Sequence, residues 1–389
     1  MTKSMNTIPK KAQGLRTWVE IDTRALGKNV HALKRVPKKG VLLMGIVKSN
    51  AYGHGLVPVA QALEAYGVAW LGVDSLVEAA RLRKEGVRTP LLVLGYTLPE
   101  HFATASKEKI SLTISSFPAL REVSTWTAKT KKRLNVHIKI DSGMHRQGFL
   151  SEDMPELSRA LSETTKFLRI EGIYSHLAEA NPEALVLGEK QIELFRDCIK
   201  ALSLATDRER GKPLLHISAS GGILCFPNEF SMVRAGAALY GLWPSPEAHK
   251  AKSKEIALTP VLSWRTLVVE IKHIRRGEKV GYSFTEAVRR DSTIAVCPIG
   301  YWHGYPRALS GKSDVLVRGK RAKVLGRVSM DMIVIDVTGI RGVSAMDVVT
   351  LIGKDGTEEL SADEVACFAG TTHYEIVTRI NPLIERIIK

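Results

Sequence analysis

The chain has 389 residues, 44% of them hydrophobic, and a formal net charge of +16 at pH 7. This length can bury a sizeable core and accommodates one large domain plus a second. The charge would permit a nucleic-acid partner, but lysine and arginine are scattered along the chain in short clusters such as 129–133. No zinc-finger spacing or RNA-binding aromatic signature accompanies them, so we expect solvated basic faces and no nucleic-acid partner.

The four cysteines are far apart and form no CxxC pair. Neither a metal site nor a disulfide framework is therefore expected, which fits a reducing compartment. The chain has no run of about eighteen apolar residues, which argues against a membrane-spanning helix. Its N-terminus is polar and basic without an apolar core segment. We expect a soluble, cytoplasmic protein.

Apolar runs typical of parallel strands buried on both faces recur through the first 240 residues. Helical periodicity lies between most of them, for example at 55–66 and 76–85. There are eight such runs, at 41–48, 70–74, 91–95, 110–114, 135–141, 168–176, 214–218 and 232–240. Eight β–α units in roughly 200 residues predict a TIM barrel. A doubly wound open sheet is the alternative, because spacing alone does not show closure.

The composition changes after 245–254, a polar and lysine-rich stretch that we interpret as a linker. Short strand-like segments separated by turn residues follow, at 261–273, 293–298, 314–317, 321–324, 332–337 and 347–351. The sequence therefore predicts an α/β protein, with a TIM (β/α)8 barrel over 24–245 and a mostly antiparallel β domain over 255–389. We expect the early strand 17–22 to join the second domain.

Polar, chemically capable residues follow the expected barrel strands, at the face where barrel enzymes keep their active sites. They are Lys48 after the first strand, Lys139, Asp141 and Arg146 after the fifth, His176 after the sixth, His216 after the seventh and Arg234 in the eighth. Taken singly, each has an ordinary explanation, such as a snorkelling lysine or a hydrogen-bonded core histidine. Their convergence on one face favours a catalytic site.

A phosphate site is indicated at the seventh and eighth strands. Ser220, Gly221 and Gly222 open a helix-like segment, and Gly236 lets backbone N–H groups approach a ligand closely. A lysine in a partly dry pocket can form a Schiff base with an aldehyde. A Schiff-base lysine and a phosphate cradle on one face point to pyridoxal phosphate.

Several motifs carry a resemblance to a known family. VKSNAYGHG, KIDSGMHRQGF, YSHL, SMVRAGAALYGL, GEKVGYS, PIGYWHG, GRVSMD and HYEI occur in order and at family spacing. With them the chain resembles the alanine racemase family from about residue 17 to residue 376. The resemblance implies an enzyme that uses pyridoxal phosphate to interconvert L- and D-alanine. Such an enzyme supplies D-alanine for bacterial peptidoglycan. It also implies a homodimer whose sites are shared between subunits.

The resemblance implies a role for each matching residue. Lys48 matches the lysine that holds the cofactor and acts as one base, and Tyr282 matches the base on the opposite face, donated by the partner subunit. The cofactor-binding positions are matched by Lys48, Tyr52, His176, Ser220, Arg234, Gly236, Ala237 and Tyr374. Arg146 and Met330 match the positions that bind the substrate carboxylate. Lys139 matches a lysine that is often carbamylated in the family. Positions behind the site or along its access route are matched by His216, Tyr301 and Asp331.

Racemisation removes a proton from one face of Cα and returns one to the other, so it needs two bases. A tyrosine can serve only when nearby cations lower the pKa of its phenol below the usual ~10. Arg234 bears on the choice of reaction, because arginine has donors only and leaves the pyridine nitrogen unprotonated. A shallower electron sink disfavours transamination and favours simple return of the proton.

The chain departs from the family pattern at His145, Ala219 and Ser329 and in its C-terminal tail. None of these changes removes a catalytic group. His145 and Ser329 lie near the expected carboxylate region, so a racemase of the same fold with broader specificity is the alternative. A decarboxylase of this fold would carry an acidic pyridine partner and a catalytic cysteine. A non-catalytic cofactor carrier would lack the domain that carries Tyr282.

Overall fold

The computed structural model describes residues 8–164, 166–202 and 212–389. These residues divide into two compact units. The barrel unit comprises residues 25–51 and 56–259, and the β unit comprises residues 52–55, 260–389 and the described residues up to Arg24. In the described part of the chain, no helix is both long and apolar enough to cross a bilayer.

The barrel unit contains one parallel sheet in the order β8-β7-β6-β5-β4-β3-β2-β9. The last strand pairs with the first, and Arg234 N donates to Ser218 O at 2.9 Å where β8 and β9 meet. Its strands are β2 (Leu42–Ile46), β3 (Trp70–Val73), β4 (Leu91–Val93), β5 (Ile110–Ile114), β6 (Leu134–Lys139), β7 (Leu168–Tyr174), β8 (Leu214–His216) and β9 (Met232–Ala235). The barrel prediction is confirmed, and the open doubly wound alternative is wrong.

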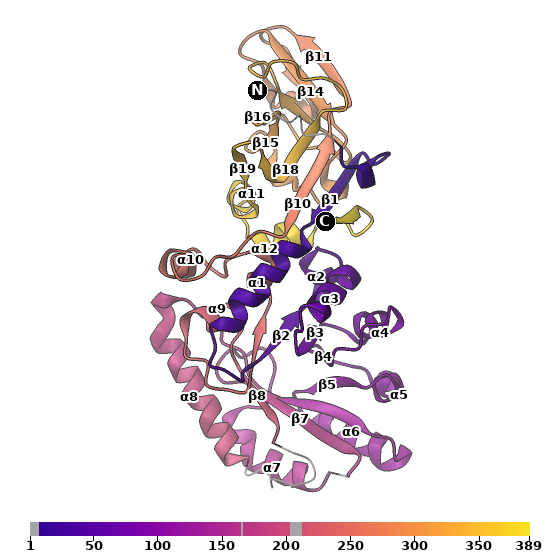
Figure 1. Cartoon of the computed structure of the whole chain (residues 1–389), viewed down its shortest axis with the longest axis vertical. Coiled ribbons are helices and arrows are strands. Elements are labelled where there is room, and N and C mark those ends of the chain that lie inside the picture. Colours follow the sequence, from indigo (N-terminus) through magenta and orange to yellow (C-terminus); the bar gives the residue numbers. More distant parts are fainter. Residues whose placement is uncertain (1–7, 165, 203–211) are drawn as a thin grey trace. The chain divides into compact units, whose positions relative to one another are not determined.

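Helices follow most of these strands (Figure 1). They are α1 (Thr23–Arg35), α2 (Lys48–Tyr52), α3 (Leu56–Ala65), α4 (Leu76–Lys84), α5 (Phe102–Lys107), α6 (Phe117–Thr130), α7 (Met154–Ser162), α8 (Leu185–Ala201), α9 (Ser220–Cys225) and α10 (Pro246–Lys252). Helix α10 lies in the stretch interpreted as a linker. Its N-cap, Ser245, accepts a hydrogen bond from Ala248 N at 3.2 Å, which supports a helix there.

The β unit is built on a mostly antiparallel sheet in the order β11-β14-β17-β16-β15-β18-β10-β1-β20. Its strands are β1 (Thr17–Ile21), β10 (Leu262–Leu267), β11 (Glu270–Ile274), β14 (Ser292–Cys297), β15 (Asp314–Val317), β16 (Lys320–Leu325), β17 (Ile333–Asp336), β18 (Val348–Asp355) and β20 (Glu385–Ile388), and β19 (Glu358–Leu360) pairs with β18. A separate ribbon contains β12 (Lys279–Val280) and β13 (Glu286–Ala287). Helices α11 (Ala362–Ala369) and α12 (His373–Thr378) follow β19.

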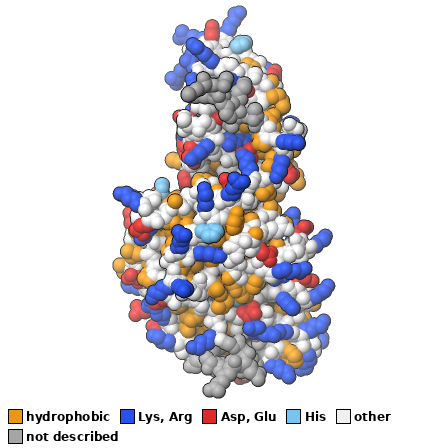
Figure 2. Space-filling model, in the orientation of Figure 1, with side chains coloured by type: hydrophobic (Ala, Val, Ile, Leu, Met, Phe, Trp, Pro, Cys, Tyr) orange, Lys and Arg blue, Asp and Glu red, His pale blue; other side chains and the backbone are white. Residues whose placement is uncertain are grey.

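Several expected strands prove shorter, and one is divided into two. The run 261–273 forms β10 and β11, because the chain changes partners there: Val268 N donates to Asp347 O and Val269 N to Val296 O, both at 2.9 Å. The run 232–240 ends as a strand at Ala235 and continues as a 3-10 turn, Ala237–Tyr240. Lysine and arginine side chains are spread over the visible face without forming one continuous patch (Figure 2).

Candidate active site

Lys48 lies directly beyond the C-terminal end of β2, as the sequence predicted. Its Nζ is 3.6 Å from Oδ1 of Asp74, which lies just beyond β3. More than a third of each side chain is exposed, so the ion pair contributes at most about 1 kcal/mol. The carboxylate of Asp74 therefore orients the Lys48 side chain but binds its amine too weakly to prevent it from moving to another partner.

The segment labelled α2, which begins at Lys48, is a left-handed turn and not a right-handed helix. Ser49, Asn50 and Ala51 have φ of 55°, 56° and 54°, a region that costs about 1–2 kcal/mol per non-glycine residue. The Asn50 side chain compensates, because its Oδ1 accepts a hydrogen bond from Leu56 N at 2.9 Å at the start of α3. Asn50 N donates to Glu78 Oε1 at 3.3 Å. The strained backbone of this turn is held in place by these hydrogen bonds, and it fixes the direction of the chain at Lys48.

Arg234 is buried in the barrel and is held by neutral acceptors. Its Nη1 donates to His216 Nδ1 at 2.7 Å, and its Nη2 donates to Ser175 O at 2.7 Å, Ile217 O at 2.9 Å and His176 Nδ1 at 3.1 Å. Burial lowers the pKa of the guanidinium from 12.5 to about 10, which leaves it a cation at neutral pH. All four bonds use the terminal nitrogens, so within the described residues Nε–H remains available to a further acceptor.

The histidines around Arg234 are neutral, and their tautomers follow from its donors. Burial, reinforced by Arg234, lowers the pKa of His176 to about 3 and that of His216 well below 6.5. Because each accepts from arginine through Nδ1, each carries its proton on Nε2. The Tyr174 ring stacks on His216 with 4.8 Å between ring centroids and lies 5.2 Å from the Arg234 guanidinium.

The chain of hydrogen bonds continues to His137, on β6. His216 Nε2 lies 3.0 Å from His137 Nδ1, and this order of donors places the proton of His137 on Nε2. Among the described residues, that nitrogen has no hydrogen-bond partner. The His137 ring packs edge-on against Trp70 with centroids 5.2 Å apart. Gly172 provides the space, since a Cβ there would lie 2.3 Å from His137 Nδ1.

The loop after β6 is wound around the carboxylate of Asp141. Oδ1 accepts from the N–H groups of Gly143, Met144 and His145 at 2.9 Å each, and Oδ2 accepts from Arg146 N at 3.0 Å. Burial alone would raise the pKa of Asp141, but these four donors bring it below its usual value. The loop thereby fixes the backbone from which Arg146 extends.

Lys139, the last residue of β6, has an unusually acidic ammonium. Burial, followed by the repulsion of Arg146 and Arg234, lowers its pKa from 10.5 to about 8. Its Nζ donates to Gln147 Oε1 at 3.0 Å and lies 5.6 Å from the centre of the Tyr174 ring. In the part of the chain that the structure describes, no carboxylate forms an ion pair with Lys139.

The residues predicted to bind phosphate in the barrel lie together where α9 begins. Ser220 is the first residue of the helix, and its Oγ accepts from Gly236 N at 3.0 Å and from Ala238 N at 3.3 Å. This brings the start of α9 beside the turn that contains Gly236 and Ala237. The first N–H groups of a helix have no acceptor within the helix, which suits an anion.

The charges at this end of the barrel fit pyridoxal phosphate. Lys48, Lys139, Arg146 and Arg234 all act to lower the pKa of His176, so four cations lie within electrostatic reach of one imidazole. The carboxylates of Asp74 and Asp141 offset only part of this charge, and a phosphate, a ring oxygen and a substrate carboxylate would balance the rest. The free Nε–H of Arg234 suits an acceptor such as a pyridine nitrogen.

Two predicted cofactor residues, Tyr52 and Tyr374, meet in the β unit. Their ring centroids are 6.1 Å apart, and Tyr374 belongs to α12. Burial raises the pKa of both phenols, so they are hydrogen-bonding groups and not bases at neutral pH. Phenol O–H groups of this kind suit phosphate oxygens.

The remaining predicted residues lie on exposed loops of the β unit. Tyr282 opens the 3-10 turn η6 (Tyr282–Phe284), and 70% of it is exposed. Tyr301 N donates to Ser329 O at 3.1 Å, which brings Tyr301 beside Met330 and Asp331. A Cβ on Gly300 would lie 2.4 Å from Met330 O, so only glycine permits this approach.

Three residues of the barrel cluster were not anticipated: His137, Gln147 and Tyr174. His137 had a signal, because it stands two positions before Lys139 on one strand and therefore shares its face. The other two had none. Gln147 reaches Lys139 only through the loop around Asp141, and Tyr174 contacts His216 across neighbouring strands.

Comparisons with known proteins agree with this arrangement. The family model described as "Alanine racemase, N-terminal domain" matches residues 21–244, and "Alanine racemase, C-terminal domain" matches residues 261–388. An alanine racemase of Syntrophobacter fumaroxidans is 38% identical over 366 residues, which cover 94% of this chain and 95% of that protein. One of Symbiobacterium thermophilum is 36% identical, covering 96% and 97%.

Solved structures give the same result. The alanine racemase of Bacillus anthracis with bound L-Ala-P aligns with a TM-score of 0.88 and 34% identity, covering 96% of this chain and 95% of that one. Both domains, their order and nearly the whole length are shared. The chain therefore belongs to the alanine racemase family of pyridoxal-phosphate-dependent isomerases.

Proposed function

We propose that this chain interconverts L- and D-alanine with Lys48 and Tyr282 as the two bases. The observation that carries the proposal is the convergence of Lys48, Arg146 and Arg234 on the carboxyl end of the barrel, in a chain of this family. Ser220, Gly236 and Ala237, with Tyr52 and Tyr374, would hold the phosphate of the cofactor. When bound, pyridoxal phosphate supplies the electron sink that makes the Cα proton of an amino acid removable.

Lys48 takes or returns the proton on one face of Cα. Its strand end and the strained turn after it hold the amine in place, and its loose contact with Asp74 leaves it able to move. Arg234 remains protonated because its pKa of about 10 lies well above neutrality. It would therefore donate a hydrogen bond to the pyridine nitrogen of a bound cofactor without giving up its proton, which would limit the electron sink and favour racemisation.

Tyr282 is the proposed base on the other face, and we propose that it acts in the site of a second copy of the chain. Its exposure supports this, since a side chain 70% exposed in its own chain is available to another. A tyrosine acts as a base near neutral pH only beside cations, and the barrel site carries four. The active form would then be a homodimer.

Arg146, with the backbone N–H of Met330, would bind the carboxylate of alanine. Lys139 sets the direction of the guanidinium. With a pKa of about 8, a substantial fraction of its amine is neutral near that pH, and a neutral amine adds to carbon dioxide with loss of a proton to give a carbamate. The resulting anion beside Arg146 would replace repulsion between two cations by attraction and fix the arginine for bidentate binding.

The activity is tested with purified protein, pyridoxal phosphate and either enantiomer of alanine, with chiral analysis of the products. Lys48→Ala should abolish racemisation, whereas Lys190→Ala, at an exposed position of α8, should leave it intact. L-serine as a second substrate measures breadth, because a racemase of broad specificity would turn it over at a comparable rate. Failure of the wild-type protein to racemise alanine would refute the proposal.

Complementation tests the shared site. Lys48→Ala and Tyr282→Phe proteins are each inactive in the proposal, but an equimolar mixture that exchanges subunits forms mixed dimers with one intact site. Random exchange should restore about a quarter of wild-type activity. A mixture that exchanges subunits but stays inactive would show that both bases come from the same chain.

A further inference from the structure

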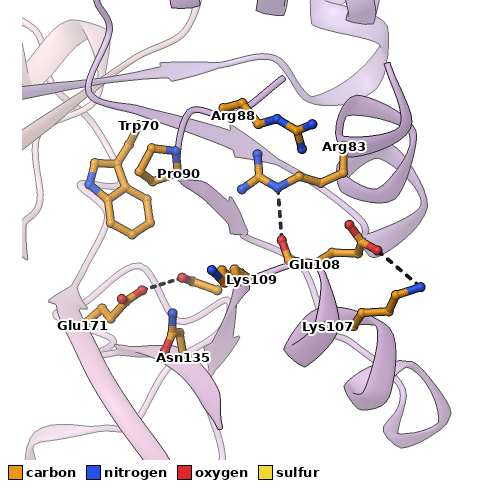
Figure 3. Close-up of a pocket in the computed structure, with 10 residues that line it drawn as sticks. Trp70, Arg83, Arg88, Pro90, Lys107, Glu108, Lys109, Asn135 and Glu171 are labelled. Atoms are coloured by element: carbon orange, nitrogen blue, oxygen red, sulfur yellow. Dashed lines mark hydrogen bonds and ion pairs between the residues drawn. The ribbon is translucent and has the colours of Figure 1, made fainter. Parts of the chain in front are cut away.

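A cavity lies at the opposite end of the barrel from Lys48. It has a volume of about 520 Å³ and opens beside the amino ends of β3, β4 and β5. Trp70 and Pro90 form an apolar wall, and Arg83, Arg88 and Lys109 are among the other lining residues (Figure 3). No residue proposed for racemisation lines it.

The charges around the cavity do not balance. Four lining residues are cationic, Arg83, Arg88, Lys107 and Lys109, and two are anionic, Glu108 and Glu171, which leaves a formal surplus of two positive charges.

Both carboxylates already have partners. Glu171 Oε2 accepts from Ser111 Oγ at 2.6 Å, and Glu108 Oε1 lies 3.9 Å from Lys107 Nζ. Among the described residues, neither arginine nor Lys109 forms an ion pair with a carboxylate. The surplus among the lining residues therefore rests on Arg83, Arg88 and Lys109. A third carboxylate, that of Glu64, does not line the cavity but accepts a hydrogen bond from Arg88 N at 2.9 Å and acts electrostatically on Arg83.

The guanidinium of Arg83 is fixed in position by hydrogen bonds to neutral backbone carbonyl oxygens. Its Nε donates to Glu108 O at 3.1 Å, and its Nη1 donates to Val87 O at 2.9 Å and Thr89 O at 2.8 Å. These bonds leave Nη2 to donate elsewhere. Burial, followed by repulsion from Arg88, lowers the pKa of this guanidinium. The carboxylates of Glu64 and Glu108 act in the opposite direction on this pKa. Two neighbouring guanidinium groups that form no ion pair with a carboxylate are a donor set suited to phosphate oxygens.

Lys109 and Asn135 complete the polar side of the cavity. Lys109 has φ of 52° directly after α5, at a position where glycine is usual, so a charged side chain is kept there at a cost of about 1–2 kcal/mol. The buried Oδ1 of Asn135 has no hydrogen-bond partner among the described residues. It can accept from a hydroxyl or a protonated phosphate oxygen.

We infer that this cavity is a binding site for a small anion of the phosphate class, separate from the cofactor site. Arg83 and Arg88 bind its oxygens from one side, and Lys109 neutralises it from the other. A compact phosphate-class anion suits this positive charge, and the volume of about 520 Å³ admits pyrophosphate or a small phosphate ester. The inference does not depend on the racemase assignment, because none of its residues takes part in that reaction.

The test is calorimetric titration of the holoenzyme, loaded with pyridoxal phosphate, with pyrophosphate and with inorganic phosphate at constant chloride ionic strength. The variant Arg88→Gln/Lys109→Gln should weaken pyrophosphate binding by about tenfold or more. The matched control Arg81→Gln/Lys84→Gln removes the same charge from exposed positions of α4 and should change it by less than about twofold. Racemase activity of both variants should equal that of wild type, which verifies the fold.

Several outcomes would overturn the inference. Uptake of neither anion by wild-type holoenzyme, beyond the effect of chloride, would refute it. Equal weakening in both double variants would show only general screening. Binding that occurs solely after removal of pyridoxal phosphate would assign the anion to the cofactor's own phosphate site.

Discussion

The buried histidines of the barrel make a quantitative prediction about acid stability. Burial, with the repulsion of Arg234, lowers the pKa of His137 from 6.5 to about 3, so the folded chain keeps this ring neutral at pH 5. The unfolded chain protonates it below about pH 6.5. Stability is therefore lost as the pH falls through 6.5 toward the folded value, and the loss from His137 reaches about 2 kcal/mol at pH 5.

The measurement is urea unfolding of the barrel at pH 7 and pH 5, followed by tryptophan fluorescence and circular dichroism. The variant His137→Gln removes the titrating ring, so it should lose about 2 kcal/mol less than wild type between the two values. His137→Phe should show the same reduced pH dependence. It should be less stable at pH 7 by about 1–3 kcal/mol, because phenylalanine leaves His216 Nε2–H without an acceptor.

Comparing two variants at one position separates titration from hydrogen bonding. The carboxylates that titrate near pH 4 are common to all three proteins and cancel in the differences. If both variants lost as much stability between pH 7 and pH 5 as wild type, His137 would be titrating normally in the folded chain, and the chain of tautomers from Arg234 would be refuted.

Three further predictions concern the same site. Gly172→Ala should destabilise the protein by about 1–3 kcal/mol, since the new Cβ would lie 2.3 Å from His137 Nδ1. The control Gly339→Ala should be tolerated, because no atom lies within 4 Å of the new Cβ. Thermal unfolding of both variants tests this prediction. Arg234→Glu should lose racemisation and gain transamination, detected as pyruvate formed from alanine. Lys139→Ala should raise the KM for alanine by about tenfold with a smaller effect on kcat, and steady-state kinetics would contradict its positioning role if only kcat fell.

The barrel could be predicted from the sequence because its strands are buried on both faces. Such strands appear as continuous apolar runs, and the polar residue after each run then falls on one face. The left-handed turn after Lys48 could not be predicted in this way. Its residues are not glycines, and the conformation is stabilised by Glu78 and Leu56, which come later in the chain.

The β unit was predicted less completely, for a related reason. Its strands are short, and their ends depend on partners far away in sequence, as when β20 pairs with β1 across the whole chain. One missed element did have a local signal. Ser361 is followed three residues later by Glu364, and its Oγ accepts from Glu364 N at 3.1 Å at the start of α11.

Arg234 is surrounded by neutral groups, which explains how one cation can both favour binding of an anionic cofactor and favour racemisation over transamination. A carboxylate partner would satisfy the same donors and cancel the charge, whereas His176, His216 and two carbonyl oxygens satisfy them and leave it in place. The site thus keeps a net positive charge for an anionic cofactor. Because Arg234 keeps its proton and the two imidazoles are neutral, the pyridine nitrogen of a bound cofactor would accept a hydrogen bond without being protonated. The same burial that keeps the histidines neutral, and so makes the folded state sensitive to acid, therefore favours racemisation.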